Sequence, residues 1–151
     1  MANTQAICTS WKVDILNGLH AFGTSVVRGT TAKDTFNGAL YLASATLNAT
    51  TTAYSATGEA SGTGYTATGT AVTNATAPAS SGTTSFWTPS ASLAWTTVTL
   101  TAVDTVLIYN NTATGKNAVA VYTFGSQTTS AANFTLTMPT NDSTNALLRI
   151  A

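Results

Sequence analysis

The chain carries few side chains that could perform chemistry, and they are spread along its length. His20 is the only histidine and Cys8 the only cysteine, so one chain cannot supply a histidine-rich metal site or an internal disulfide. Ser10 and Asp14 lie close to His20, which leaves a Ser, His and Asp triad open, although no Gly-x-Ser-x-Gly turn surrounds a serine. We expect His20 to be a partly exposed helix residue. No metal, no cofactor and no enzymatic activity are expected.

Acidic side chains are equally sparse, and no two are adjacent. A glycosidase needs two carboxyl groups that face one bond, which only folding could bring together here. The available acids are Asp14, Asp34, Glu59, Asp104 and Asp142. We expect the aspartates at strand ends and turns to act as capping residues. Glu59 is the only charged residue in 35–103 and stands among glycines, so we expect it to accept backbone N–H bonds and fix a loop.

The composition limits the partners that the chain can have. Thr occurs 34 times and Ala 26 times among 151 residues, whereas only 7% are charged, against roughly a quarter in average soluble proteins. Five basic and five acidic residues cancel, so the basic excess that nucleic acid requires is missing. The N-terminus and the apolar runs predict neither secretion nor membrane insertion. With 44% hydrophobic residues the chain should fold, and its neutral surface favours association with copies and partners.

One helix is predicted, near the N-terminus. Ser10 is a suitable N-cap residue. An apolar stripe follows at helical spacing and comprises Trp11, Ile15, Leu19 and Phe22. The pattern predicts a helix over about 10–22, which packs either on its own domain or on a neighbouring subunit.

Beyond residue 34 the sequence predicts strands. β-branched and aromatic runs alternate with Gly, Asn, Ser and Pro, the pattern of strands and turns. The predicted strands are 35–42, 65–72, 84–87, 93–103, 105–109, 118–124, 133–138 and 146–150. About eight strands are typical of an antiparallel β-sandwich or jelly roll. We therefore expect a single mainly β domain over 1–151.

Two segments within this domain have distinct patterns. Residues 106–109 and 118–122 are nearly continuous apolar runs on either side of Gly115, which predicts a hairpin buried on both faces. Alternation also places Val98, Leu100 and Ala102 on one buried face. The Thr-, Ala- and Gly-rich region 47–85 should form ordered loops and edge strands, with its tyrosines as anchors.

Aromatic residues near Pro89 form a further candidate site. Tryptophan faces can stack on sugars, but packing in a core or at a subunit interface is the commoner role. Together with the helical stripe, these aromatic residues complete the predicted assembly contacts, which are Trp11, Ile15, Leu19, Phe22, Phe86, Trp87 and Trp95.

Several segments carry a resemblance to a known group of proteins. The clearest are SWKVDILNGLH at 10–20, DTFNGALY at 34–41 and TAYSATGEASGTGYT at 52–66, and the runs 106–110, 118–125 and 146–150 fit as well. The chain resembles small virion proteins of tailed bacteriophages over nearly its whole length. The Gly-Glu-Ala-Ser-Gly-Thr-Gly-Tyr run is the most specific part. The chain departs from the group after Tyr65, where a glycine pair is expected and only Gly69 is present.

The resemblance implies a structural virion component. The expected role is a capsid decoration (cement) protein that binds the major capsid protein and its own copies, as a homotrimer by analogy with other cement proteins. It would be made in the host cytoplasm and lie on the capsid surface, with no nucleic-acid or membrane partner. Two alternatives remain: a tail or fibre component that binds host glycan through exposed Trp87 or Trp95, and a hydrolase that uses His20 with a neighbouring carboxylate.

Overall fold

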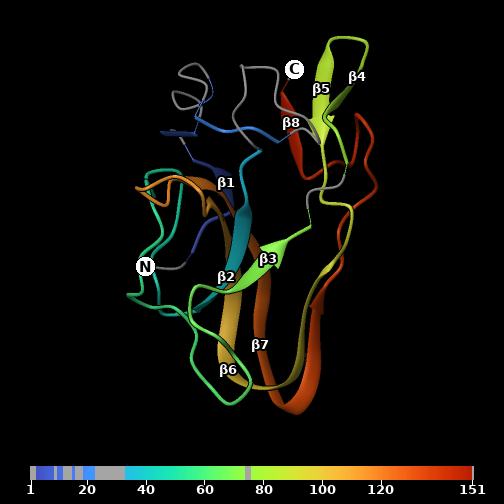
Figure 1. The fold of residues 1–151 in the computed structure, drawn as a ribbon. Coiled ribbons are helices and arrows are strands. Elements are labelled where there is room, and N and C mark those ends of the chain that lie inside the picture. Colours follow the sequence, from blue (N-terminus) through green and yellow to red (C-terminus); the bar gives the residue numbers. More distant parts are fainter. Residues whose placement is uncertain are drawn as a thin grey trace.

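The protein is mainly β and forms two antiparallel sheets (Figure 1). A computed structural model describes residues 3–8, 10–11, 15, 19–22, 33–73 and 76–150. The strands in these residues are β1 (Ala6–Ile7), β2 (Phe36–Leu42), β3 (Thr70–Val72), β4 (Ala79–Ser81), β5 (Thr84–Trp87), β6 (Leu93–Asn110), β7 (Ala118–Leu136) and β8 (Leu148–Ile150). The larger sheet has the order β1-β7-β6-β2-β3 and the smaller has the order β4-β5-β8.

The prediction of a mainly β protein is confirmed, but the eight strands are not the eight predicted. The predicted strands 93–103 and 105–109 are one strand, β6, and 118–124 and 133–138 both belong to β7. Backbone pairing continues through polar residues that periodicity alone treats as a break. Two of the predicted strands shorten to β3 and β8, and β1 and β4 were missed because they are only two and three residues long.

A helix over 10–22 is not seen. Ser10, Trp11 and Ile15 are helical, whereas residues 19–22 are not; the remaining positions lie outside the described residues. The carboxylate of Asp34 accepts the Ala21 N–H at 2.8 Å, so this N–H binds the body of the protein instead of a helical carbonyl. The predicted helix was therefore wrong at its C-terminal end.

The β6–β7 hairpin forms the centre of the fold, as predicted from the apolar runs around Gly115. At its closed end the residues 106–109 and 118–121 are at most 4% exposed, so both faces are buried. β2 pairs with β6 along this end, from Phe36 opposite Asn110 to Leu42 opposite Val103, and β1 pairs with β7. The edge strands β3 and β4 lie in the region 47–85, where edge strands were expected.

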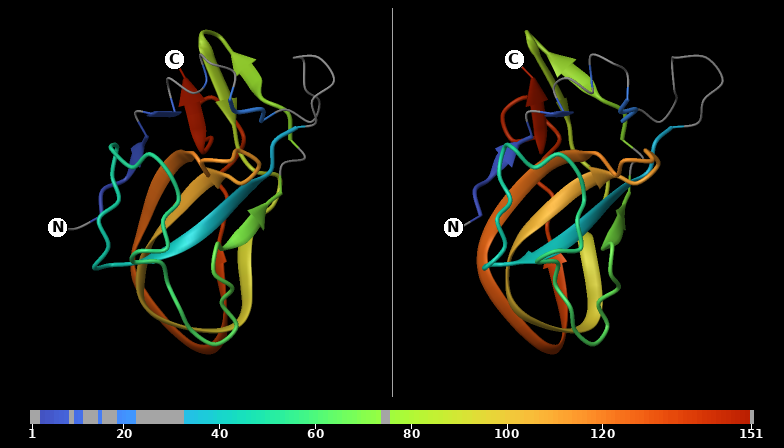
Figure 2. Two further views of the ribbon diagram at one scale, coloured as in Figure 1. Left: turned by 60° about the vertical axis from the view of Figure 1, so that its left-hand side comes forward. Right: turned by 90° about the vertical axis from the view of Figure 1, so that its left-hand side faces the viewer.

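The open half of this hairpin, formed by the start of β6 and the end of β7, bends back over the closed half (Figure 2). β6 and β7 have 18 and 19 residues, whereas most strands have about 3–10. Repeated register shifts interrupt their pairing, and left-handed backbone conformations occur at Thr97, Ala102, Gly125 and Ala131. Such bulges bend a strand and increase its twist. The hairpin can therefore enclose a core between its own two halves.

Polar side chains complete the hydrogen bonding at these bulges. A bulge removes a backbone N–H from the ladder, and an N–H without an acceptor costs free energy. Three such groups donate to side chains of the opposite strand: Thr97 N–H to Asn133 Oδ1 at 3.0 Å, Ala102 N–H to Thr128 Oγ1 at 3.1 Å and Ala131 N–H to Thr99 Oγ1 at 3.1 Å. Part of the high threonine content thus has a structural role.

The core between the two halves explains one error of the alternation pattern. Val98 and Leu100 are fully buried, as predicted, but Ala102 is a bulge residue and Val103 takes the inward position instead. At the open end of the hairpin, Leu93 packs against Gly38 of β2, where a Cβ atom would lie only 2.6 Å from Leu93 Cδ1. Gly38 therefore allows the bent hairpin to close over β2.

Candidate functional site

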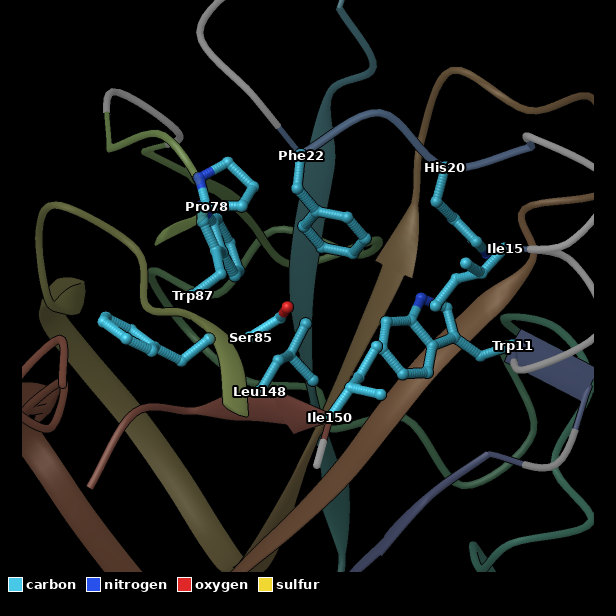
Figure 3. Close-up of a pocket in the computed structure, with 10 residues that line it drawn as sticks. Trp11, Ile15, His20, Phe22, Pro78, Ser85, Trp87, Leu148 and Ile150 are labelled. Carbon is cyan, nitrogen blue, oxygen red and sulfur yellow. The ribbon is translucent and has the colours of Figure 1, made fainter. Parts of the chain in front are cut away.

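Most of the predicted contact residues gather around one cavity, between the small sheet and the N-terminal segment (Figure 3). The cavity has a volume of about 220 Å³. It is lined by Trp11, Ile15, His20, Phe22, Pro78, Ser85, Phe86, Trp87, Leu148 and Ile150. We call it the aromatic cavity. β5 and β8 supply one wall and residues of the N-terminal segment supply the other, so the cavity joins residues that are far apart in the sequence.

Phe22 lies at the centre of the ring contacts that form this cavity. Its ring stacks on Phe36 of β2 with centroids 4.4 Å apart. It also meets Trp87 of β5 at 4.8 Å and Trp11 at 6.1 Å, both edge to face. Offset and edge-to-face ring pairs stabilise beyond the area they bury. These contacts attach the N-terminal segment to both sheets.

Two buried polar residues, Asp34 and Asn110, fix the same segment. Asn110 Nδ2 lies 3.0 Å from Asp34 Oδ2, 3.2 Å from the Leu19 carbonyl and 3.2 Å from His20 Nδ1. The Asn110 Oδ1 accepts two backbone N–H groups of the following turn, which settles the orientation of the amide. His20 Nδ1 therefore lies on the donor side of this amide.

This arrangement does not give the triad that Ser10, Asp14 and His20 would need. The Ser10 hydroxyl is buried and has no hydrogen-bond partner among the described residues, so it makes no bond with His20. The amide of Asn110 binds both His20 and Asp34. Asp14 lies outside the described residues. His20 is half-buried rather than part of a helix, and its visible role is structural.

The other described aspartates each accept hydrogen bonds from nearby polar groups. Asp104 accepts a hydrogen bond from Asn3, and Asp142 accepts bonds from Thr144 and Asn145 in an exposed turn. In the part of the chain that the structure describes, no three His, Cys, Asp or Glu side chains are close enough to hold a metal ion. Asp104 and Asp142 therefore have visible roles as hydrogen-bond acceptors that fix local structure.

Glu59 organises a second polar cluster, the Glu59 loop. Its Oε2 accepts the Tyr54 hydroxyl at 2.5 Å, and its Oε1 accepts the Tyr65 hydroxyl at 2.9 Å and the Thr68 N–H at 2.7 Å. Tyr65 also accepts the Leu40 N–H of β2 at 3.0 Å. The prediction that Glu59 binds a backbone N–H and fixes a loop is confirmed, and the tyrosines act as its anchors.

The phenols of this loop remain protonated at neutral pH. Burial raises the pKa of Tyr41 to about 12. Burial and the hydrogen bonds to Glu59 raise the pKa values of Tyr54 and Tyr65. Each phenol therefore stays a donor to its oxygen acceptor. The cluster is suited to holding the loop, not to transferring protons.

The comparisons with known proteins leave the site to be interpreted from its geometry. No protein-family model, curated protein or solved structure matches this chain. Within the described residues, no helix has the length and apolar content that crossing a membrane requires.

The two tryptophans predicted as glycan contacts do not form an exposed binding face. Trp87 and Trp95 are 3% and 5% exposed, so neither ring is free to stack on a sugar at the surface. Trp95 packs on Phe134 at 5.9 Å, apart from the aromatic cavity, and Leu19 contributes its carbonyl to Asn110. Cys8 is fully buried, as predicted for a small apolar residue, and burial raises its thiol pKa to about 11.

Sequence reasoning missed Ile150, which is half exposed. At 51% exposure it is the only exposed large hydrophobic residue among those described. It lies on β8 beside the aromatic cavity, with Leu148 on the same face of the strand. The alternation of Leu148, Arg149 and Ile150 was the available signal, but it did not show that the last residue stays exposed.

Proposed function

We propose that this chain is a structural protein of a bacteriophage virion, most specifically a capsid decoration (cement) protein. In this role it stabilises the head from the capsid surface through contacts with the major capsid protein and with its own copies. It is made in the host cytoplasm and carries out no catalysis. The sequence resemblance motivates the proposal, and the distribution of charge supports it.

The observation that carries the proposal is the scarcity of charged residues along the chain. No charged residue occurs in 117–141, which covers the whole of β7, and Glu59 is the only one in 35–103. Most of the charged side chains that the structure describes hydrogen-bond within the chain. They are Asp34, Glu59, Asp104, Lys116, Asp142 and Arg149. Uncharged surface can be buried against neighbours without desolvating ions, and the cores of interfaces are depleted of charge.

The finer architecture we propose is a β-sandwich or jelly roll. The two halves of the bent hairpin face each other across a shared core, which supports a layered arrangement. We propose a homotrimer as the assembly, in line with the closed symmetry of most oligomers. The aromatic cavity and the exposed Ile150 mark the end of the molecule where contacts with neighbours are expected.

Counting copies in purified virions tests this function. Quantitative mass spectrometry of whole particles, with the major capsid protein as the internal standard, should find this chain in a fixed ratio to capsid subunits. Imaging of labelled particles should place it on the head. A handful of copies at the tail would overturn the cement role in favour of a tail component. No structural observation favours glycan binding, because the indoles that motivated it are buried.

A further inference from the structure

We propose that the aromatic cavity binds a small neutral molecule made of one apolar ring attached to a hydrogen-bond acceptor oxygen. An aryl ketone is the simplest example. The inference does not depend on the virion role. It rests on the volume of the cavity, on a described lining without Asp, Glu, Lys or Arg, and on one buried indole donor that has no acceptor among the described residues.

The buried donor is the indole N–H of Trp11. Trp11 is 4% exposed, and its Nε1 is buried without a hydrogen-bond partner in the described part of the chain. Figure 3 shows this nitrogen on the side of the indole that faces the cavity. Trp87, on the opposite wall, donates its own N–H to the Thr76 carbonyl at 2.9 Å. A buried donor without an acceptor destabilises a protein, so an acceptor oxygen from a ligand would be favourable at Trp11.

The size and lining of the cavity define the rest of the ligand. Apolar cavities of about 150 Å³ bind benzene, and this cavity is larger, at about 220 Å³. One ring with a short substituent therefore fits. Phe22, Trp87, Leu148 and Ile150 offer apolar surface to the ring. The described lining residues include no Asp, Glu, Lys or Arg, which favours a neutral ligand over an ion.

The entrance has one additional polar group. Ser85 is exposed at the rim, and its hydroxyl oxygen points into the cavity in Figure 3. Trp11 and Ser85 thus lie on different walls of a mainly apolar space, which His20 also lines. A few polar groups in a mainly apolar cavity are typical of sites that orient small ligands.

Two probes of nearly equal shape test the proposal. Acetophenone has the ring and the acceptor oxygen, and ethylbenzene has the ring alone. Both are titrated into ¹⁵N-labelled protein while the indole N–H signals are recorded. We expect acetophenone to shift the Trp11 signal saturably and to bind at least tenfold more tightly than ethylbenzene. Absence of binding, or equal affinity for both probes, would overturn the proposal.

Three variants distinguish the effect of the Trp11 hydrogen bond from the effect of the cavity volume. Trp11→Phe keeps a ring but removes the donor, so it should lose the preference for acetophenone. Trp95→Phe is the matched control, because among the described residues the Trp95 N–H is also buried without a partner but lies outside the cavity, and the preference should persist. Ser85→Phe should block both probes, and it remains informative if Trp11→Phe fails to fold because Ser85 is exposed. Undiminished binding in Ser85→Phe would place the ligand elsewhere and refute the site.

Discussion

Thr68 has a backbone conformation that glycine prefers, and its neighbours hold it there. Its φ is 75°, as is that of Gly69, in the position where the resemblance leads us to expect a glycine pair. Its N–H donates to Glu59, and its carbonyl accepts the Tyr109 hydroxyl at 2.8 Å and the Asn37 amide at 3.2 Å. These bonds keep a β-branched residue in the left-handed region. The turn therefore stores strain that a glycine would relieve.

We predict that Thr68→Gly raises the free energy of unfolding by roughly 1 kcal/mol. The left-handed conformation costs an L residue about 1–2 kcal/mol, and the greater flexibility of unfolded glycine offsets part of that gain. Urea denaturation measures the difference. Thr66→Gly is the control, because Thr66 is exposed and has no positive φ, and it should lower stability. A loss of stability in both variants would contradict the strain.

Glu59 is the residue on which the loop depends. Replacing it by alanine leaves two phenols and one backbone N–H without their acceptor. The two phenols are partly buried and the N–H is exposed, so water can replace part of the lost bonding. We predict that Glu59→Ala lowers the free energy of unfolding by about 1–3 kcal/mol. Ser61→Ala, at an exposed position of the same loop, should change it by less than about 0.5 kcal/mol. Equal effects in urea denaturation would show that Glu59 does not hold the loop.

Tyr41, whose hydroxyl donates to the Ser55 carbonyl, predicts a loss of stability in alkali. The pKa of Tyr41 rises from 10.0 in its ordinary state to about 12 in the folded protein. Below about pH 10 both states keep the proton, and at higher pH the unfolded chain releases it first. The free energy of unfolding should therefore fall as the pH increases from 10 to 12. Denaturation curves across this range should show a smaller fall in Tyr41→Phe, and an unchanged slope would contradict the assignment.

At the scale of elements, the closed end of the hairpin could be predicted and its bend could not. The apolar runs 106–109 and 118–122 around Gly115 indicate a buried hairpin directly. The bend depends on left-handed residues at Thr97, Ala102 and Ala131, and neither threonine nor alanine signals such a conformation. Pairing with the opposite strand imposes it. Among the left-handed positions of the bend, only Gly125 has a residue type that favours this conformation.

The bend should respond in opposite directions to two small substitutions. Gly125 has a φ of 77°, and no atom of the described residues lies within 4 Å of the position that an alanine Cβ would take, so Gly125→Ala adds backbone strain alone. We predict a loss of about 1 kcal/mol in the free energy of unfolding. Ala131→Gly, at a φ of 47°, should change it little or raise it. Thermal and urea denaturation report both, and a tolerated Gly125→Ala would show that the bend is not fixed there.

In the N-terminal segment too, the sequence pattern predicted part of the candidate site but not its backbone geometry. Helical spacing grouped Trp11, Ile15, Leu19 and Phe22, and all of these except Leu19 line one cavity. It failed for the backbone, because Asp34 binds Ala21 across 13 positions and Asn110 binds Leu19 across 91. Such long-range bonds leave no trace in local periodicity. The grouping of side chains was therefore predictable, and the geometry that they adopt was not.

At the scale of the whole molecule, charged residues are few, and most of those that the structure describes bind within the chain. The charged residues that a soluble surface ordinarily displays serve here to fix loops and turns, as Glu59 and Asp142 do. Little electrostatic repulsion then opposes contact between copies. Ile150 is the point at which the apolar surface of the described residues is most exposed, and it lies on β8 of the small sheet. Contacts between copies should therefore depend on this end of the molecule.

We predict that Ile150→Lys reduces self-association without reducing stability. The side chain is 51% exposed, so its replacement removes little from the core, whereas an added charge must be desolvated in any contact that covers it. Sedimentation velocity over a range of concentrations measures the association, and thermal denaturation measures stability. Ser126→Lys adds the same charge at an exposed position on the bend of the hairpin and is the matched control. Equal losses of association in the two variants would mean that net charge, rather than this end of the molecule, governs assembly.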